Sequence, residues 1–370
     1  MQPVRWVRLW FVAILLLPCA GHKPIVAAED AGWLVSPELL RHANLKVVWR
    51  NQLPMQKTET LDRLMIVENR IYALSSRNFM VSMDRHQGSI IFARVIAPPG
   101  FVVMGLELYE NELVSTIGNE LVELDPNTGR EIRYMRPEFG IVCPPARNSS
   151  YFYVSGTDKR LHVLQADNRV QVFEVAAENE PLITSIIADE DFVVFGTNAG
   201  NVISITANRP NKLWQFNATK AIAGPIVRDE TSFFFASEDT HVYRVDMGDL
   251  FTSRMIWKTQ LPGILHTAPR VTESTVYQYT RGKGLIAIDK RTGELIWSVE
   301  QGWDLLAESA GRAYVMTNMR ILVVMDNQRA KRLYSVNFTE VARHAANTID
   351  SKIYVADQTG YVACLEPTGR

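Results

Sequence analysis

The chain has 370 residues, a formal net charge of −1 and a hydrophobic content of 47%, which is ample for a packed core. No linker-like shift of composition divides it, so one large domain is favoured over two. The balanced charge excludes the strongly basic surface that nucleic-acid binding requires, and no nucleic-acid partner is expected.

The first residues have the pattern of an export signal covering residues 1–28. Arg5 and Arg8 precede the apolar run 9–17, and small side chains lead to a cleavage site after Ala28. The apolar run is too short to span a bilayer comfortably, which disfavours an uncleaved anchor. Removal of this segment takes away three basic residues and no acidic ones, which changes the net charge from −1 to −4. An exported protein, periplasmic or otherwise extracytoplasmic, is predicted.

A lipid anchor at Cys19 is the less favoured alternative for the same segment. Leu16 and Leu17 precede it as in a lipoprotein box, but Pro18 stands where such boxes prefer a small residue. Peripheral membrane association, through a lipid or through a partner, stays open.

Residues 29–44 are expected to form an N-terminal arm with one short helix. Ser36 is a suitable N-cap residue, Pro37 suits the first helical turn, and Leu39 and Leu40 supply an apolar pair. We expect this helix to pack on the rim of the domain that follows.

A sequence motif recurs along the rest of the chain. Residues 282–297 contain an apolar run, Asp289, a polar turn ending at Gly293, and an aromatic residue four positions later at Trp297. An aspartate followed by a glycine in this spacing is typical of a tight turn between two strands. Related stretches occur at 83–92 and 124–134.

A second feature, here called the marker pair, gives the period of the repeat. It is a pair of β-forming residues, often ending on an aromatic. The marker pairs are Ile71-Tyr72, Leu113-Val114, Phe152-Tyr153, Val193-Val194, Phe233-Phe234, Val276-Tyr277, Ala313-Tyr314 and Ile353-Tyr354. Their second members are 37 to 43 residues apart. Repeats of this length without a helical period predict the four-stranded blades of a β-propeller.

The outer strand of each repeat carries one aromatic residue. These residues are Phe92, Tyr134, Phe173, Trp214, Trp257, Trp297 and Tyr334. Recurrence once per blade indicates packing between neighbouring sheets and not a binding platform.

The two ends of the chain are expected to share the eighth blade. After Ile353-Tyr354 the chain has only one more strand-like run, at 361–365, whereas residues 45–50 near the N-terminus form an orphan strand with Trp49. Pairing these segments removes two open sheet edges. The sequence therefore predicts an all-β, eight-bladed β-propeller over residues 45–370, closed by the strand at about 45–50.

Two cysteines and two histidines are candidate site residues. Cys143, placed in an inner strand, and Cys364, placed in a middle strand, lie in blades that are not neighbours, so two buried thiols are favoured over a disulfide. His266 and His344 fall in predicted inner strands, where they either line the axial channel and meet there or serve separate blades.

Two further features lie at the predicted surface. The second blade is rich in acids, with Arg130, Arg133 and Arg136 following them, which favours a solvated, charge-balanced face. Trp303 interrupts the register of the aromatics, in a predicted connection between blades, and is the candidate residue for contact with a partner.

The pattern of residues 285–297, with weaker copies at 80–92, 121–134 and 361–369, resembles the repeat of the pyrroloquinoline-quinone-like β-propeller family. The resemblance covers essentially the whole mature chain. It implies the propeller fold strongly and an activity weakly, because the repeated residues build turns and contacts between blades.

The resemblance implies two kinds of function. Quinone-dependent dehydrogenases of this family hold calcium and often carry a disulfide between adjacent cysteines; here no two cysteines are adjacent and no acid and amide cluster suggests the metal site. The second group consists of non-catalytic lipoprotein scaffolds of outer-membrane assembly, similar in size and layout to this chain.

We therefore expect an exported, non-catalytic scaffold that binds a protein in the cell envelope as a monomer. No catalytic, cofactor-binding or metal-binding residues are expected. A quinone-dependent oxidoreductase and a protein that binds a glycan or small ligand at the channel mouth remain the alternatives.

Overall fold

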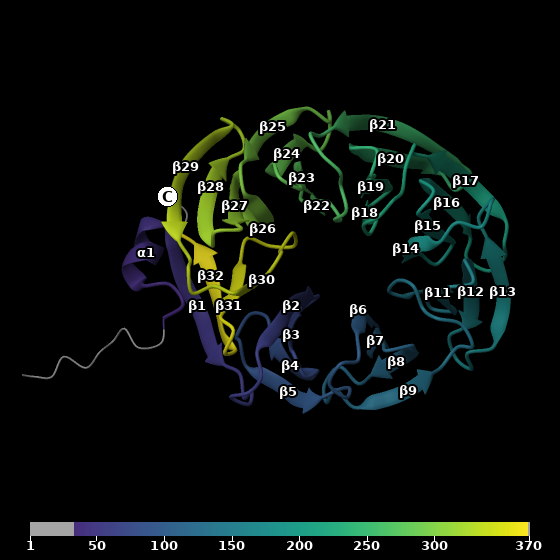
Figure 1. Cartoon of the computed structure of the whole chain (residues 1–370), viewed down its shortest axis with the longest axis horizontal. Coiled ribbons are helices and arrows are strands. Elements are labelled where there is room, and N and C mark those ends of the chain that lie inside the picture. Colours follow the sequence, from purple (N-terminus) through teal and green to yellow (C-terminus); the bar gives the residue numbers. More distant parts are fainter. Residues whose placement is uncertain (1–32, 369–370) are drawn as a thin grey trace, which may run out of the picture. The chain divides into compact units, whose positions relative to one another are not determined.

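The computed structural model describes residues 33–368. Its compact unit, which begins at Leu34, contains eight four-stranded antiparallel sheets arranged around a central axis (Figure 1). The predicted all-β, eight-bladed propeller is confirmed. The proposed export signal of residues 1–28, with Cys19, lies outside the described residues.

Each blade runs from an inner strand at the axis to an outer strand at the rim. Blade 1 contains β2 (Leu61–Val67), β3 (Arg70–Ser75), β4 (Phe79–Asp84) and β5 (Ile90–Val95); blade 2 contains β6 (Val103–Tyr109), β7 (Glu112–Ile117), β8 (Glu120–Leu124) and β9 (Glu131–Met135); blade 3 contains β10 (Ala146–Arg147), β11 (Tyr151–Ser155), β12 (Arg160–Gln165) and β13 (Gln171–Ala176); blade 4 contains β14 (Ile183–Ala188), β15 (Phe192–Thr197), β16 (Asn201–Thr206) and β17 (Lys212–Asn217).

The second half of the ring repeats this arrangement. Blade 5 contains β18 (Val227–Asp229), β19 (Ser232–Ala236), β20 (His241–Asp249) and β21 (Thr252–Gln260); blade 6 contains β22 (Arg270–Val271), β23 (Thr275–Thr280), β24 (Gly284–Asp289) and β25 (Leu295–Val299); blade 7 contains β26 (Gly302–Ser309), β27 (Arg312–Thr317), β28 (Ile321–Asp326) and β29 (Lys331–Asn337); blade 8 contains β30 (Arg343–Ala345), β31 (Ile353–Ala356), β32 (Tyr361–Pro367) and β1 (Leu45–Gln52).

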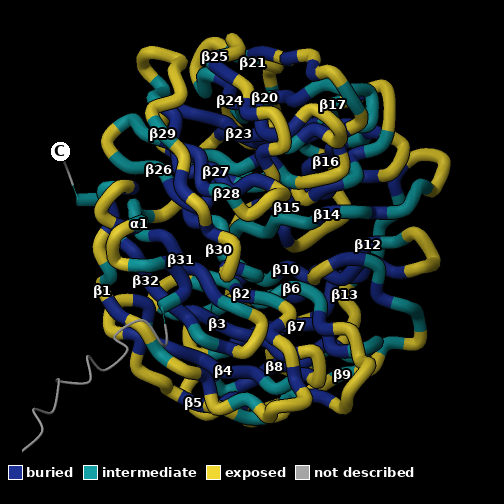
Figure 2. The backbone as a smooth tube through the Cα atoms, turned by 60° about the vertical axis from the view of Figure 1, so that its left-hand side comes forward, coloured by how far each residue is buried: buried dark blue, intermediate teal, exposed yellow. Residues whose placement is uncertain are grey.

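The core of the ring is formed by the two middle strands of each blade. Every marker pair lies in the second strand of its blade, and β15 is buried along its whole length. A strand that neighbouring sheets cover on both faces is mainly apolar and lacks a strict alternation of buried and exposed residues, as β15 does. Figure 2 shows the buried strands inside and the exposed turns at the surface.

The termini of the propeller meet in blade 8, as predicted. Strand β1 pairs antiparallel with β32, from Leu45 opposite Pro367 to Gln52 opposite Tyr361, with one irregularity between Val47 and Trp49. The sheet order is β1-β32-β31-β30. The backbone ladder that closes the ring therefore joins residues from the two ends of the chain.

The aspartate turns owe their shape to local hydrogen bonds. Asp289 Oδ1 accepts from the backbone N–H groups of Arg291 at 3.0 Å and Thr292 at 2.7 Å. Gly293 follows with a φ of +77°, which a glycine adopts at low cost. The hydrogen bond from the Thr292 backbone lowers the pKa of Asp289.

The outer aromatic of one blade packs on the aspartate turn of the next. Trp257 Nε1 donates to Lys290 O at 2.9 Å, and a β-carbon on Gly293 would lie 2.7 Å from the Trp257 ring. Buried members of this set are Trp49, Phe92, Trp214, Trp257 and Trp297. The predicted role in packing between sheets is confirmed for these residues.

Tyr134 is an exception, and its predicted burial between sheets is wrong. Its side chain is 58% exposed. The corresponding turn of blade 3 has Gln165 in place of the aspartate and Arg169, at a φ of +65°, in place of the glycine. The Arg169 side chain enters the space between blades 2 and 3, where it contacts Glu123.

The short helix expected near residue 36 is present as α1 (Pro37–His42). Ser36 caps it by accepting a hydrogen bond from Leu39 N at 3.3 Å, and Leu40 is buried. Tyr334 Oη of β29 donates to Ala43 O at 2.8 Å, which fixes the end of the helix beside blades 7 and 8 (Figure 1). Within residues 33–368, no helix is long and apolar enough to cross a membrane.

Both cysteines of the described chain are buried and unpaired. Cys364 lies in β32, as expected, but Cys143 precedes β10 and is not part of it. The inner strand of blade 3 contains only two residues, and it begins after Cys143. The prediction that Cys143 lies in this strand is therefore wrong. Burial raises the pKa of Cys143 to about 11 and that of Cys364 to about 12.

Candidate functional site

Trp303 lies at the start of β26, the inner strand of blade 7. The prediction that it belongs to a connection between blades is therefore wrong, because the strand already begins at Gly302. A β-carbon on Gly302 would lie 2.9 Å from Leu285 Cβ, so a glycine permits this close approach to blade 6. Trp303 is 51% exposed, and its ring centre is 4.9 Å from that of Tyr279.

A small cavity opens beside these two aromatic rings. Its volume is about 150 Å³, and it is lined by Thr267, Ala268, Arg270, Tyr277, Tyr279, Leu285, Trp303 and Asp304. Ligand pockets commonly measure roughly 300–1,000 Å³. The cavity is therefore of a size for one side chain or a small chemical group.

The polar wall of this cavity is an ion pair between neighbouring inner strands. Arg270 of β22 donates from Nε to Asp304 Oδ1 at 3.0 Å and from Nη2 to Asp304 Oδ2 at 3.1 Å. His344 of β30 approaches the same carboxylate, with Nε2 3.3 Å from Oδ2. Three adjacent blades thus meet at Asp304.

The charge of Asp304 is stabilised by these two neighbours. Burial alone raises the pKa of the carboxyl group, but the contacts with His344 and Arg270 outweigh this effect and lower the pKa to about 2. A bidentate arginine–carboxylate pair is also geometrically stiff. The site therefore presents a fixed arginine beside two aromatic rings.

The two histidines singled out from the sequence do not meet. His344 lies in an inner strand, as predicted, and contacts Asp304. His266 lies in the connection before β22, so its predicted place in an inner strand is wrong; its Nδ1 is 3.3 Å from Glu238 Oε1. Each histidine has a carboxylate partner of its own, which agrees with the alternative that they serve separate blades.

Sequence reasoning missed Arg270 and Asp304 as members of the site. Asp304 adjoins Trp303, but an isolated aspartate gives no sign of its partners. The available signal was spacing: Arg270 and His344 are 34 and 40 residues from Asp304, close to one repeat on either side. Residues one repeat apart in inner strands lie side by side in a propeller.

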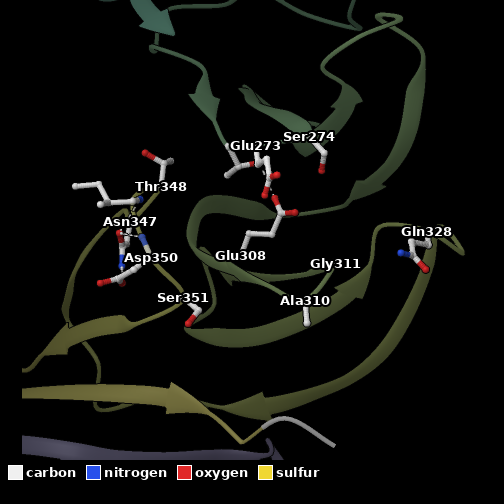
Figure 3. A pocket seen from close by; sticks show the side chains of 12 residues that line it. Glu273, Ser274, Glu308, Ala310, Gly311, Gln328, Asn347, Thr348, Asp350 and Ser351 are labelled. Atoms are coloured by element: carbon white, nitrogen blue, oxygen red, sulfur yellow. Dashed lines mark hydrogen bonds between the residues drawn. The ribbon is translucent and has the colours of Figure 1, made fainter. Parts of the chain in front are cut away.

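A larger polar cavity of about 400 Å³ opens at the other ends of these blades (Figure 3). Glu273 and Glu308 point toward one another there, while Asn347 and Asp350 lie across the cavity (Figure 3). Glu308 accepts hydrogen bonds from Thr272 Oγ1 at 2.6 Å and from Tyr277 Oη at 2.7 Å. The Glu308 carboxylate of blade 7 therefore binds two hydroxyl groups of blade 6 and connects the two blades.

The acid-rich second blade also departs from expectation. Arg130, Arg133 and Arg136 are exposed, as predicted. Glu123, however, is only 1% exposed and Arg169 contacts it directly, so this part of the predicted solvated face is a buried ionic cluster. Arg147 contacts Glu112 in the same cluster, and Arg133 lies at its edge. Burial raises the pKa of Glu123 despite Arg169. Burial also acts to raise the pKa of Glu112, but Arg147, Glu123 and Arg133 together outweigh it and lower that pKa.

The described chain offers little for a metal-dependent quinone cofactor. Within residues 33–368, no three His, Cys, Asp or Glu side chains gather closely enough to hold a metal ion. The cavity beside Trp303, at about 150 Å³, is also small for a whole cofactor. The cavity beside Trp303 therefore does not fit that cofactor.

Comparison with known proteins connects this architecture to a family. Residues 198–369 match the family model described as outer membrane protein assembly factor BamB. Comparison with curated protein sequences gives no match.

Two solved structures share the fold. BamB from Moraxella catarrhalis is similar with a TM-score of 0.66 and 14% identity, over 87% of this chain and 97% of that chain. The computationally designed Ika8 protein is similar with a TM-score of 0.65 and 14% identity, over 85% of this chain and 98% of that chain. Residues 198–369, which include the aspartate turn at Asp289, thus match a PQQ-like, BamB-like repeat family, and the two solved structures share the propeller fold.

Proposed function

We propose that this protein is an exported, non-catalytic propeller scaffold that binds another protein in the cell envelope, in the assembly of outer-membrane proteins. The family match over residues 198–369 supports this proposal, as does the similarity to BamB across nearly the whole of that protein. The basic and apolar start of the sequence supports export.

The observation that carries the proposal is the exposure of Trp303 on a rigid element. An indole that is 51% exposed on an inner strand is held in place by the sheet, unlike an aromatic on a loop. Tryptophan is enriched among the residues that dominate protein interfaces. Met319, which is 63% exposed, lies in the neighbouring turn between β27 and β28. The backbone N–H of Asn318 in this turn donates a hydrogen bond to Gln301 O at 2.9 Å, close to Trp303 in the chain.

We refer to the end of blades 6 and 7 that carries Tyr279, Trp303 and Met319 as the Trp303 face. Consecutive turns of an antiparallel sheet lie at opposite ends of its strands. The turn that contains Ile349, between β30 and β31, therefore belongs to the opposite face. Ile349 is 62% exposed and provides a matched control for apolar exposure.

The experiment is affinity purification of the tagged full-length protein from envelope extracts after mild chemical cross-linking. We expect a specific protein to be recovered with the wild-type chain and with Ile349→Ala, and its yield to fall at least about tenfold with Trp303→Ala. Equal recovery with all three proteins would contradict a role for the Trp303 face. Absence of any recovered protein from folded wild-type material would contradict the scaffold function itself.

A further inference from the structure

Arg270 lines the cavity, and one of its guanidinium nitrogens lies outside the ion pair with Asp304. Two of its three guanidinium nitrogens, Nε and Nη2, bind Asp304, and Nη1 takes no part in that pair. The Arg270 side chain is 41% exposed, whereas that of Asp304 is 17% exposed. The carboxylate therefore fixes the arginine from behind while one edge of the guanidinium remains open to a ligand.

The cavity next to this open edge is mainly apolar. Leu285, Tyr277 and Ala268 line it, and Trp303 and Tyr279 stand at its border. Interfaces commonly place one large anchor side chain in such a pocket, and most of the binding energy comes from a few anchors of this kind. A volume of about 150 Å³ suits a leucine or phenylalanine side chain.

The charges around the cavity favour an acidic partner. Arg281 and Lys283 are exposed in the turn between β23 and β24, at the same end of the blades as Trp303. Arg320 is exposed in the corresponding turn of blade 7. Two acids oppose these three basic residues: Glu300, exposed at the same end of the blades, and Glu238, which is 3.3 Å from His266. The surroundings of the neutral Arg270–Asp304 pair therefore remain positive.

We propose that the Trp303 face binds an extended segment of a partner protein in which an acidic side chain neighbours a large apolar one. The apolar side chain enters the cavity beside Trp303 and Tyr279. The carboxylate accepts hydrogen bonds from Nη1 of Arg270. This inference rests on the proposed function, because it names the chemistry of the protein segment that the scaffold recognises.

Recognition by charge alone would look different from recognition by this pocket. A general positive field attracts any acidic segment and depends little on which basic residue supplies the charge. A fixed guanidinium edge requires arginine at position 270 and an apolar side chain next to the carboxylate. Substitution of one basic residue at a time distinguishes the two cases.

The test uses the full-length protein and fluorescein-labelled peptides. The probe is Gly-Ser-Gly-Leu-Glu-Phe-Gly-Ser-Gly, and its matched control has glutamine in place of glutamate. A hydrogen bond to a charged group contributes about 1.5–3 kcal/mol, so we expect the glutamate peptide to bind at least about tenfold more tightly in fluorescence anisotropy titrations.

Three variants assign that preference to residues. Arg270→Lys keeps the positive charge that neutralises Asp304. Lysine has no guanidinium edge left to bind a second carboxylate, so we expect this variant to lose the preference for the glutamate peptide. Arg281→Gln removes an exposed charge from the same face and should retain the preference. Trp303→Ala should weaken both peptides to the same degree, by about fivefold or more, because it removes the apolar anchor site.

Defined results overturn the inference. The first is equal binding of the two peptides by the wild type. The second is an unchanged preference for the glutamate peptide in Arg270→Lys. The third is a loss of this preference in Arg281→Gln as large as that in Arg270→Lys. Binding of free 4-phenylbutyrate as tightly as the peptide would assign the cavity to a small carboxylate and would also overturn it. Thermal melting of each variant confirms that the proteins compared are folded.

The outcome is distinguishable from failure of the scaffold function. If Trp303→Ala abolishes recovery of the envelope partner while the peptides bind equally, the scaffold function stands and the acidic recognition is wrong. If the partner is recovered equally with Trp303→Ala and the peptides also bind equally, the role of the Trp303 face and the acidic recognition are both wrong, whereas the scaffold function stands. If folded wild-type protein recovers no partner, the scaffold function itself is wrong.

Discussion

A β-carbon placed on Gly88 would lie 2.4 Å from the indole ring of Trp49. Trp49 belongs to the strand that closes the ring, and Gly88 ends the aspartate turn of blade 1. Trp49 Nε1 also donates to Arg85 O of that turn at 3.0 Å. The closing strand is thus held by packing on the next blade as well as by its ladder with β32.

We expect Gly88→Ala to lower the free energy of unfolding by about 3 kcal/mol. The new methyl group meets the Trp49 ring, and the backbone φ of +71° is unfavourable for alanine. Gly100→Ala is the matched control, because Gly100 has a φ of +90° and nothing lies within 4 Å of its added β-carbon; it should cost about 1 kcal/mol. Denaturant unfolding measures both. Equal losses would show that contact with Trp49 contributes nothing.

The outer aromatics should differ in their contribution to stability according to their burial. Trp49→Ala removes a side chain that is 8% exposed and should cost about 4 kcal/mol. Tyr134→Ala removes one that is 58% exposed and should change stability by less than about 0.5 kcal/mol. Thermal and chemical unfolding provide the comparison. A large loss in Tyr134→Ala would contradict its assignment as the exposed exception.

The buried ionic cluster between blades 2 and 3 should be strongly coupled. Arg169→Met leaves the 1%-exposed Glu123 without its direct partner and should cost about 3 kcal/mol. Replacing both residues by methionine removes the uncompensated charge, so the double variant should lie within about 1 kcal/mol of the wild type. Additive losses in this double-mutant cycle would mean that the pair is not coupled.

The stability contributed by Asp304 should depend on pH. Its folded-state pKa of about 2 is below the ordinary value of about 3.9, so the contribution is present above the unfolded pKa and is lost as the pH falls toward 2. We expect the stability difference between wild type and Asp304→Asn to shrink by about 2 kcal/mol between pH 6 and pH 2. Asp167→Asn, at an exposed turn, controls for net charge. A difference that stays constant over this range would contradict the ion pair.

The buried thiols should be inert in the folded protein. Burial raises the pKa of Cys143 to about 11 and that of Cys364 to about 12, so the reactive thiolate is scarce at pH 8. In a Cys19→Ala background, an aromatic disulfide reagent should modify neither residue in the native state and both in denaturant. Rapid native-state modification of either thiol would show that its blade opens.

The repeated parts of the fold were predictable because their chemistry is local. The turn at Asp289 depends on five consecutive residues that end at Gly293. The ring closure follows from a missing outer strand at one end of the chain and an orphan strand at the other. The burial of Trp257 on Gly293 follows from the same spacing. These features need no knowledge of contacts between distant residues.

The errors arose where a side chain from another blade intervenes. Arg169 replaces the turn glycine of blade 3 and enters the space next to Glu123, so the exposure of Tyr134 and the buried acids were missed together. The site at Asp304 was missed because three separate inner strands build it. Trp303 was recognised as unusual, but its place in a strand depended on the contact of Gly302 with Leu285.

The most direct test of a protein-binding Trp303 face is site-specific photo-cross-linking in the cell envelope. A photoreactive benzoylphenylalanine is introduced in place of Met319, 63% exposed on that face, and separately in place of Ile349, 62% exposed on the opposite face. We predict a covalent adduct to one partner protein from position 319 and none to it from position 349. Adducts to that protein from position 349 alone, or from neither position, would contradict the account.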